Sequence, residues 1–221
     1  MRIATYNIQS ANYGRSMDEI NKEITDLKID IIGFQEIDNL TRRSGGVNVL
    51  NEICKNDYKY YEYSASMEFD GGYYGIGIAS VYPIQLIKTV HYETADLEPR
   101  ILMICKVNID NKIVYIANTH LSYENIEIRN KQFRLLSNEL KKYTPIILFG
   151  DFNVSSFNEF DVIDLSKVNS SETPIESFKE EIPFRCIDNI FYSNEIKLIK
   201  TELNKSESSD HNMIWADINI T

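Results

Sequence analysis

The sequence has few cysteines, prolines and glycines, and it lacks a long apolar run. Its 221 residues include 3 cysteines, 5 prolines and 9 glycines. Cys54, Cys105 and Cys186 are odd in number and lack the close spacing of a metal site, which indicates reduced thiols in a cytosolic protein. The chain shows no leader-like start and no apolar stretch of membrane-spanning length. We therefore expect a cytoplasmic protein without stable membrane insertion.

Positive charge is also scarce. The chain has 23 Lys and Arg residues against 33 Asp and Glu residues, which gives a formal net charge of −10. This balance argues against a broad basic surface that grips the phosphates of a nucleic acid without regard to sequence. It leaves open an enzyme acting on nucleic acid whose own cation neutralises the reacting phosphate.

The sequence contains no repeat, no low-complexity tract and no linker rich in Pro, Gly and Ser, so we expect one domain over residues 1–221. A capping box at Ser16 and Glu19 predicts a helix to about Leu27, and further helices are expected over 46–56, 126–142 and 156–164. Residues 164–184 read as a loop. The expected strands cover 2–8, 30–35, 58–65, 74–81, 85–92, 100–109, 112–119, 145–151, 187–193, 196–203 and 212–220. Strands with helices inserted between them predict an α/β fold of two packed sheets with helices outside.

One short stretch places chemistry at the end of a buried strand. Pro145 to Phe149 is apolar, Gly150 breaks the pattern, and Asp151 and Asn153 follow. Side chains at positions i and i+2 of a strand point to the same side, so we expect the carboxylate and the carboxamide to leave the strand together. Taken alone, the stretch is more typical of a strand followed by an Asx turn than of a functional site.

Several other expected strands also end in polar residues. They contribute Asn7, Gln35-Glu36, Asn118-Thr119-His120, Asp188-Asn189 and Ser209-Asp210-His211. If these ends meet at one edge, their carboxylates need a compensating positive charge. A hard divalent cation such as Mg²⁺ or Mn²⁺ suits oxygen ligands of this kind, whereas zinc is disfavoured because no cysteine joins the set. Asp188 would also hold the imidazole of His211 in one tautomer, and His120 adds another donor. Such a set would support attack of water on a phosphorus ester.

These residues, taken in order along the chain, identify a resemblance to a known family. The sequence resembles the endonuclease/exonuclease/phosphatase superfamily, which includes DNase I-like nucleases, deadenylases, sphingomyelinases and inositol-phosphate 5-phosphatases. The match runs from residue 7 to residue 211. The motifs that carry it are Asn7, Gln35-Glu36, Thr119-His120-Leu121, Gly150-Asp151-Phe152-Asn153, Ile187-Asp188 and Ser209-Asp210-His211.

The resemblance implies a four-layer sandwich, in which two mainly antiparallel sheets are flanked by helices, together with divalent-metal-dependent phosphoester hydrolysis. It makes Glu36 the principal metal ligand, with Asn7 and Asp210 beside it. Asp151 and Asn153 would orient or deprotonate the attacking water and bind the phosphate. His211, oriented by Asp188, and His120 would contact phosphoryl oxygens, and the role of general base stays shared between Asp151 and His211. Arg129 and Gln132 match a pair that looks structural in the family.

The substrate stays open within phosphoesters. We expect a monomer that hydrolyses a phosphodiester or phosphomonoester, with a nuclease acting on DNA or RNA as the alternative; nucleic acid ranks level with lipid and small-molecule phosphoesters as the substrate. A catalytically inactive binding module is a third reading, which retention of every motif residue opposes. Arg42-Arg43 either reaches a substrate phosphate or is solvated, and the glycine-rich segment 71–75 either cradles a phosphate or enters a strand.

Overall fold

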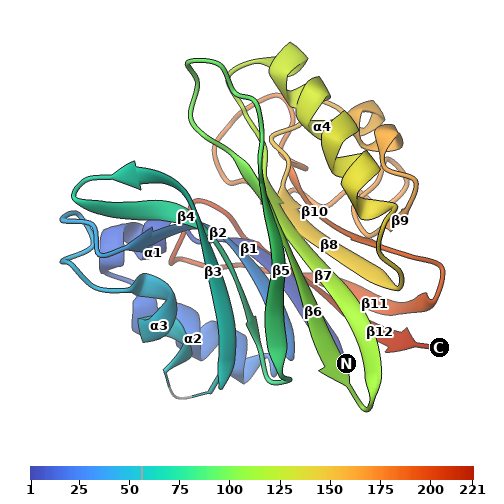
Figure 1. Ribbon diagram of the computed structural model, residues 1–221, viewed down its shortest axis with the longest axis horizontal. Coiled ribbons are helices and arrows are strands. Elements are labelled where there is room, and N and C mark those ends of the chain that lie inside the picture. Colours follow the sequence, from blue (N-terminus) through green and yellow to red (C-terminus); the bar gives the residue numbers. More distant parts are fainter. Residues whose placement is uncertain (56) are drawn as a thin grey trace.

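Two six-stranded sheets packed face to face form the centre of the protein (Figure 1). The structure is a computed structural model, and it describes residues 1–55 and 57–221. The first sheet has the order β11-β12-β1-β2-β4-β3, with strands at Ile196–Asn204, Met213–Ile220, Arg2–Asn7, Ile31–Asn39, Gly72–Ser80 and Tyr60–Phe69. The second has the order β5-β6-β7-β8-β10-β9, with strands at Ile84–His91, Ile101–Ile109, Lys112–His120, Ile146–Asp151, Asp188–Tyr192 and Ser166–Lys167. The pairs β1–β2 and β7–β8 are parallel and the other pairs are antiparallel, which confirms the predicted sheets.

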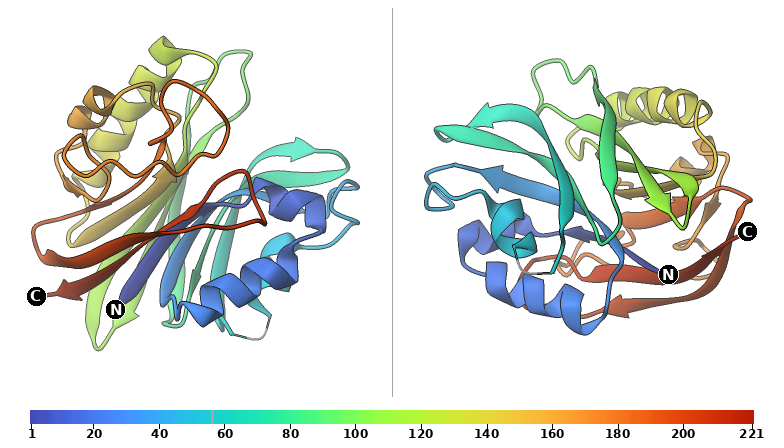
Figure 2. Two further views of the ribbon diagram at one scale, coloured as in Figure 1. Left: turned by 180° about the vertical axis from the view of Figure 1, so that it is seen from behind. Right: turned by 60° about the horizontal axis from the view of Figure 1, so that its bottom comes forward.

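Helices cover the outer face of each sheet, as Figures 1 and 2 show. The first sheet is covered by α1 (Gln9–Gly14), α2 (Met17–Asp26) and α3 (Val49–Cys54), and the second by α4 (Ile126–Leu140) and the 3-10 helix η1 (Phe157–Val162). One apolar cluster fills the space between the sheets. A second lies between the first sheet and its helices, and a third lies between the second sheet and its helices. Three apolar layers between four layers of secondary structure confirm the four-layer sandwich.

Some expected elements differ in extent from the observed ones. Strand β2 continues beyond Glu36 through a β-bulge, and the expected α-helix at 156–164 is a 3-10 helix. Ser16 is the N-cap of α2, but its side chain makes no cap hydrogen bond, so the expected capping box is wrong. Helix α3 is shorter than the expected 46–56, and residue 56 lies outside the described residues. No helix in the described part of the chain is long and apolar enough to cross a membrane.

Helix α1 has an unusual hand. Ser10 to Tyr13 have φ between 49° and 56°, which makes this turn left-handed. Such backbone costs roughly 1–2 kcal/mol per residue relative to the right-handed form. Two side-chain hydrogen bonds oppose that cost: Gln9 Nε2 donates to Asp210 Oδ2 at 3.0 Å, and Arg43 Nη2 donates to Ser10 Oγ at 2.9 Å. The turn therefore sits where it contacts the motif residues at the end of the first sheet.

The two sheets approach closely beneath the ends of β1, β2, β7 and β8. A Cβ atom at Gly33 in β2 would lie 2.6 Å from Cβ of Phe149 in β8, so a larger residue at this position would push the sheets apart. Buried amides also link the sheets, because Gln35 Nε2 donates to Asn118 Oδ1 at 2.7 Å. Asn118 in turn donates to the carbonyls of Phe34 and Gly77, each at 2.8 Å. These contacts fix the register at which strand ends from both sheets meet.

Candidate active site

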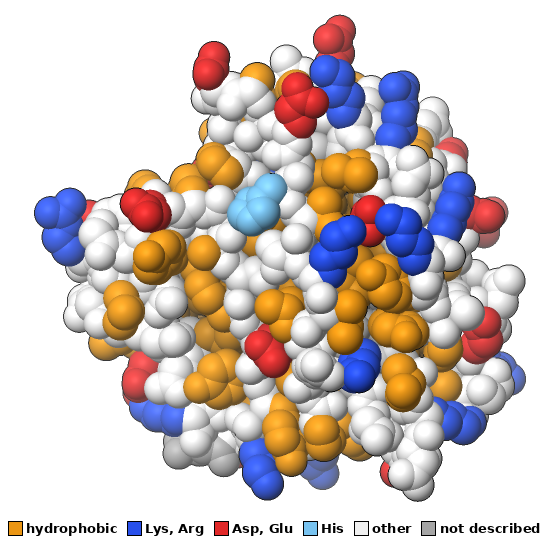
Figure 3. Space-filling model, viewed as in Figure 1, with side chains coloured by type: hydrophobic (Ala, Val, Ile, Leu, Met, Phe, Trp, Pro, Cys, Tyr) orange, Lys and Arg blue, Asp and Glu red, His pale blue; other side chains and the backbone are white. Residues whose placement is uncertain are grey.

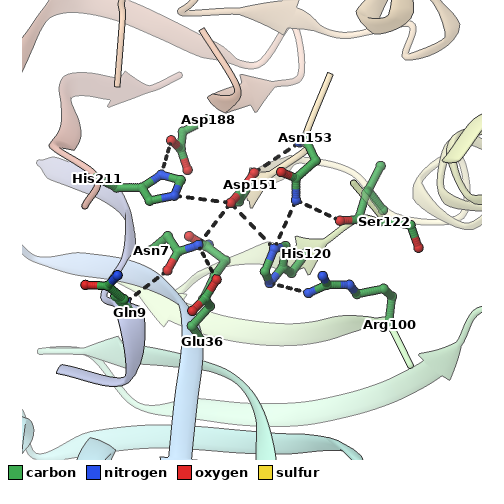
Figure 4. A network of polar contacts seen from close by, with 12 residues as sticks. Asn7, Gln9, Glu36, Arg100, His120, Ser122, Asp151, Asn153, Asp188 and His211 are labelled. Atoms are coloured by element: carbon green, nitrogen blue, oxygen red, sulfur yellow. Dashed lines mark hydrogen bonds and ion pairs between the residues drawn. The ribbon is translucent and has the colours of Figure 1, made fainter. Parts of the chain in front are cut away.

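A cleft of about 710 Å³ opens where strands of both sheets end. Figure 4 shows the motif residues of both sheets pointing toward one another in this region. Each residue expected to act in catalysis or to bind a metal lies in the cleft wall or makes a hydrogen bond to a residue that does. The residues that line the cleft include Glu36, His120, Asp151, Asn153, Asp210 and His211. Strand ends that are distant in sequence therefore converge.

Asp151 is the last residue of β8 and is 1% exposed. Its Oδ2 accepts a hydrogen bond from Asn7 Nδ2 at 3.0 Å, and its Oδ1 accepts one from the backbone N–H of Asn153 at 3.0 Å. Asn153 has φ of 50°, so it has left the strand conformation. The expected alternation of side chains is therefore not what joins the pair. An Asx turn instead holds Asn153 beside Asp151. The two interpretations of this stretch, an Asx turn and a pair of functional residues, are therefore compatible.

Asp188 holds the imidazole of His211 from behind. His211 Nδ1 lies 2.8 Å from Asp188 Oδ2, which also accepts a hydrogen bond from Ser177 Oγ at 2.5 Å. Burial alone would lower the pKa of His211, but the charge and hydrogen bond of Asp188, followed by the charges of Asp151 and Asp210, outweigh burial and raise that pKa. The raised pKa favours the imidazolium form of His211, whose Nε2 points into the cleft 3.7 Å from Asp151 Oδ2.

The pKa of Asp151 is shifted upward. Burial is the largest cause and the charge of Asp188 the next, while His211 and the hydrogen bond from Asn7 act in the opposite direction. A carboxylate with a raised pKa takes up a proton more readily than an exposed aspartate does. Its position beside a water-accessible cleft makes Asp151 suited to accept a proton from water.

His120 has a different protonation state from His211. Its Nδ1 lies 2.8 Å from Nη1 of Arg100, which can only donate, so Nδ1 is the acceptor and Nε2 carries the proton. Burial, then the charges of Arg100 and His211, hold the pKa of His120 well below its ordinary value. His120 is thus a neutral donor whose Nε2 lies 3.5 Å from Asp151 Oδ2. Nδ2 of Asn153 lies 3.1 Å from the same nitrogen, but it is itself a donor, which gives its hydrogen bond to the carbonyl of Leu121.

Sequence reasoning missed Arg100 and Gln9. Arg100 is 3% exposed and pairs with Glu98 at 2.9 Å. The signal for Arg100 was its place directly before an apolar strand, where it is liable to be buried. A buried arginine seldom lacks a charged or polar partner. Gln9 lies in the left-handed turn, which no pattern in the sequence indicated. Its backbone N–H donates to Asn7 Oδ1 at 3.0 Å, and its side chain reaches Asp210.

Glu36, Asn7 and Asp210 lie on the first-sheet side of the cleft. Glu36 has φ of 58° at the bulge in β2, which turns its side chain out of the ladder. Asn7 Nδ2 donates to Glu36 Oε1 at 3.1 Å as well as to Asp151, and Asp210 joins the group through Gln9. Asn7 thus contacts Glu36 directly, and Gln9 links Asn7 to Asp210.

The donor chemistry fits a hard divalent cation. Carboxylate oxygens of Glu36 and Asp151 converge on one atom, Asn7 Nδ2, as two ligands converge on a positive charge. Asn7 would offer its oxygen to a cation only with its amide turned over, because that oxygen now faces Gln9. Donor atoms of Asp151, Asp188 and His211 also lie within 4.8 Å of one another, so this group could bind a metal ion as well. Asp188 Oδ2 already accepts two hydrogen bonds, whereas Glu36 is partly exposed and lines the cleft.

Other residues singled out in the sequence have structural surroundings. Arg129 is buried and binds Glu159 at 2.8 Å, and Gln132 Nε2 donates to Ser122 Oγ at 2.8 Å, which fits their expected structural role. Arg43 lines the cleft, but its guanidinium is held by Asp38. The glycine-rich segment 71–75 forms the turn and start of β4, where the backbone of Gly72 packs against Asn39 and Leu40.

Comparison with known proteins places this geometry in a family. A model described as "Endonuclease/Exonuclease/phosphatase family" matches residues 4–211. A search of curated proteins found no match. Among solved structures, an endonuclease/exonuclease/phosphatase from Beutenbergia cavernae is similar at 16% identity and TM-score 0.76, covering 100% of this chain and 71% of that one.

Two other similar structures have names that state an activity or a bound ion. Mannosyl-6-phosphatase Bt3783 from Bacteroides thetaiotaomicron is 17% identical with TM-score 0.72, and each chain is covered at 100%. The human Nocturnin catalytic domain with bound sulfate is 17% identical with TM-score 0.75, covering 100% of this chain and 93% of that one. At such identities the likeness concerns the fold alone. The family match covers residues 4–211, a range that includes every motif residue that meets in the cleft, and the chain belongs to the endonuclease/exonuclease/phosphatase family.

Proposed function

We propose that this protein is a divalent-metal-dependent phosphoesterase, in which water attacks a phosphodiester or phosphomonoester. The observation that carries the proposal is the convergence of Glu36 and Asp210 with Asp151, His120 and His211 around one cleft. The cleft is then faced by an anionic group for the cation, a base of raised pKa, one cationic histidine and one neutral histidine. This is the set of groups that metal-assisted hydrolysis of an ester of phosphorus needs.

Asp151 is the proposed general base. Its raised pKa brings proton uptake nearer to neutral pH, and its Oδ2 faces both histidines. Asn7 and the backbone of Asn153 hold its two oxygens, so the carboxylate enters the reaction already oriented. Water in the cleft would give its proton to Asp151 as its oxygen attacks phosphorus.

His211, His120 and Asn153 are the proposed donors to the phosphoryl oxygens. His211 is cationic because of Asp188, and His120 is a neutral donor because Arg100 blocks its other nitrogen. Preformed donors of this kind stabilise the charge that develops in the transition state without having to reorient. Glu36, Asp210 and, with its amide turned, Asn7 would hold a Mg²⁺ or Mn²⁺ ion. That ion would supply further positive charge to the reacting phosphate and to the attacking water.

Hydrolysis assays with and without metal test the proposal. The purified protein is incubated with Mg²⁺ or with EDTA against bis-p-nitrophenyl phosphate, inositol phosphates, sphingomyelin, and abasic and single-stranded oligonucleotides. We expect phosphate ester cleavage that stops with EDTA and returns with added Mg²⁺ or Mn²⁺. Cleavage confined to the oligonucleotides would favour a nuclease instead. Absence of turnover on every substrate in the presence of metal would favour the inactive binding module.

A further inference from the structure

The cleft has apolar walls on both sides of the proposed reacting groups. One wall is part of the long loop before β10, with Phe178, Ile182, Pro183 and Phe184, and the other is formed by Met67, Phe69 and Tyr74 of the β3–β4 hairpin. The ring of Phe178 lies 4.8 Å from the ring of His211, so the apolar wall begins directly beside the proposed phosphate position. Tyr123, at the rim, is 64% exposed and Ile182 is 41% exposed, which leaves apolar surface ready to be covered.

The charges in the cleft limit how much negative charge a ligand can bring. Among the described residues that line it, the cations apart from histidine are Arg43 and Arg100. Arg43 is held by both oxygens of Asp38, at 2.6 and 2.8 Å, and Arg100 is held by Glu98 at 2.9 Å. Neither guanidinium is therefore available to neutralise a second phosphate.

The carboxylate side chains that line the cleft outnumber these two cations. They are Glu36, Glu98, Asp151, Glu180 and Asp210. One divalent ion at the group around Glu36 would balance a single reacting phosphate, but the excess of acid beyond it would repel a second anionic group. Figure 3 shows one outer face of the protein, where Lys and Arg side chains are interspersed with acidic and hydrophobic ones. A polyanionic strand would find little continuous basic surface there.

We propose that the substrate is a small phosphodiester with one anionic phosphate, in which the ester group that stays on phosphorus after cleavage is apolar and aromatic and packs between the loop 178–184 and Tyr123. This inference rests on the proposed function and names its substrate class. Aromatic faces of Phe178, Phe184 and Tyr123 suit a planar ring, because ring stacking adds to the gain from removing apolar surface from water. A sugar phosphate or a polyphosphate would leave these faces bare and place its own polar groups against them.

Esters that differ in one group alone test the inference. Methyl p-nitrophenyl phosphate and phenyl p-nitrophenyl phosphate share the leaving group and the single charge, so a difference in kcat/KM reports the retained ester group. We expect kcat/KM to be about tenfold or more higher for the phenyl ester, mainly through KM. Phe184→Ala and Tyr123→Ala should each reduce this ratio. Ile199→Ala, an exposed apolar residue on β11, should leave the ratio as it is.

A binding measurement separates failure of this inference from failure of the proposed function. Phenylphosphonate and methylphosphonate have the same charge, and calorimetric titration with either needs no turnover. About tenfold tighter binding of phenylphosphonate, lost in Phe184→Ala, supports the aromatic site even if no ester is cleaved. Equal affinities with equal kcat/KM for the two esters would overturn the inference while leaving the phosphoesterase standing. Faster cleavage of oligonucleotides or inositol polyphosphates than of the phenyl ester would overturn it too.

Discussion

The two sheets contribute different kinds of residue to the cleft. The first sheet supplies Asn7 and Glu36, and the loop between β11 and β12 supplies Asp210; Glu36 and Asp210 are partly exposed, with the Asp210 side chain 28% accessible. The second sheet supplies His120, Asp151 and Asp188, which are 4%, 1% and 1% exposed. Glu36 and Asp210 are thus open to water and ions, whereas Asn7, at 1% exposed, is as buried as the residues of the second group.

Backbone conformation separates the two groups as well. Glu36 sits at a bulge with positive φ, and Asp210 is approached by a left-handed turn. His120, Asp151 and Asp188, by contrast, stand at the ends of regular strands paired in register, with His120 opposite Asp151 and Asp151 opposite Asp188. Regular pairing fixes the buried residues before any ligand binds, whereas irregular backbone directs the open residues toward solvent. We infer that the second sheet sets the proton chemistry and the first sheet sets the metal requirement.

The largest effect on turnover should come from a change at the buried residue Asp151. Asp151→Asn keeps the shape of the side chain but removes the carboxylate that is proposed to take the proton. We expect turnover of bis-p-nitrophenyl phosphate to fall by roughly 10²-fold or more at saturating Mg²⁺, with the fold preserved. Asp161→Asn is the matched control, since Asp161 is exposed and pairs with Lys167. Near-normal turnover in folded Asp151→Asn protein would remove Asp151 from the mechanism.

A change at the exposed residue Glu36 should alter how the rate depends on the Mg²⁺ concentration. Glu36→Gln removes one negative charge from the group proposed to hold the ion, so the Mg²⁺ concentration for half-maximal rate should rise about tenfold or more. High Mg²⁺ should then recover part of the rate, which it should not do for Asp151→Asn. Glu202→Gln, at a half-exposed pair with Lys200, serves as the control. An unchanged Mg²⁺ dependence with a lower rate would place Glu36 with the buried group instead.

The same comparison explains what the sequence could predict. Residues at the ends of regular strands follow from apolar runs, because a run and its polar end mark a strand and its edge. Asp151 and His120 were located in this way. The position of the Glu36 side chain depends on a bulge, and that of Gln9 depends on a left-handed turn in which five successive residues other than glycine, 9–13, have positive φ. Local propensity disfavours both conformations, so tertiary contacts decide them.

Pairing between side chains was harder to predict than position. The Asp188–His211 pair could be expected from an acid and a base in two motifs, but the Arg100–His120 contact joins a residue outside every motif to one inside. Likewise, the sequence marked Arg43 as able to reach a phosphate, whereas the structure engages it with Asp38. A sequence shows which groups exist, and only packing shows which of them have already been neutralised.

The smallest expected effect concerns the protonation states of His211 and His120, which also test the contrast between the two sheets. In metal-free protein, NMR titration of the imidazole resonances should find His211 protonated beyond the pH at which an ordinary histidine loses its proton, and His120 neutral. Asp188→Asn removes the charge that raises the pKa of His211, so that pKa should fall and the alkaline loss of activity should move to lower pH. Ser177→Ala, which keeps the Asp188 carboxylate, should cause a smaller change. If the titration of His211 is the same in Asp188→Asn as in the unaltered protein, then the charge of His211 does not come from Asp188, and the division of roles between the sheets loses its electrostatic basis.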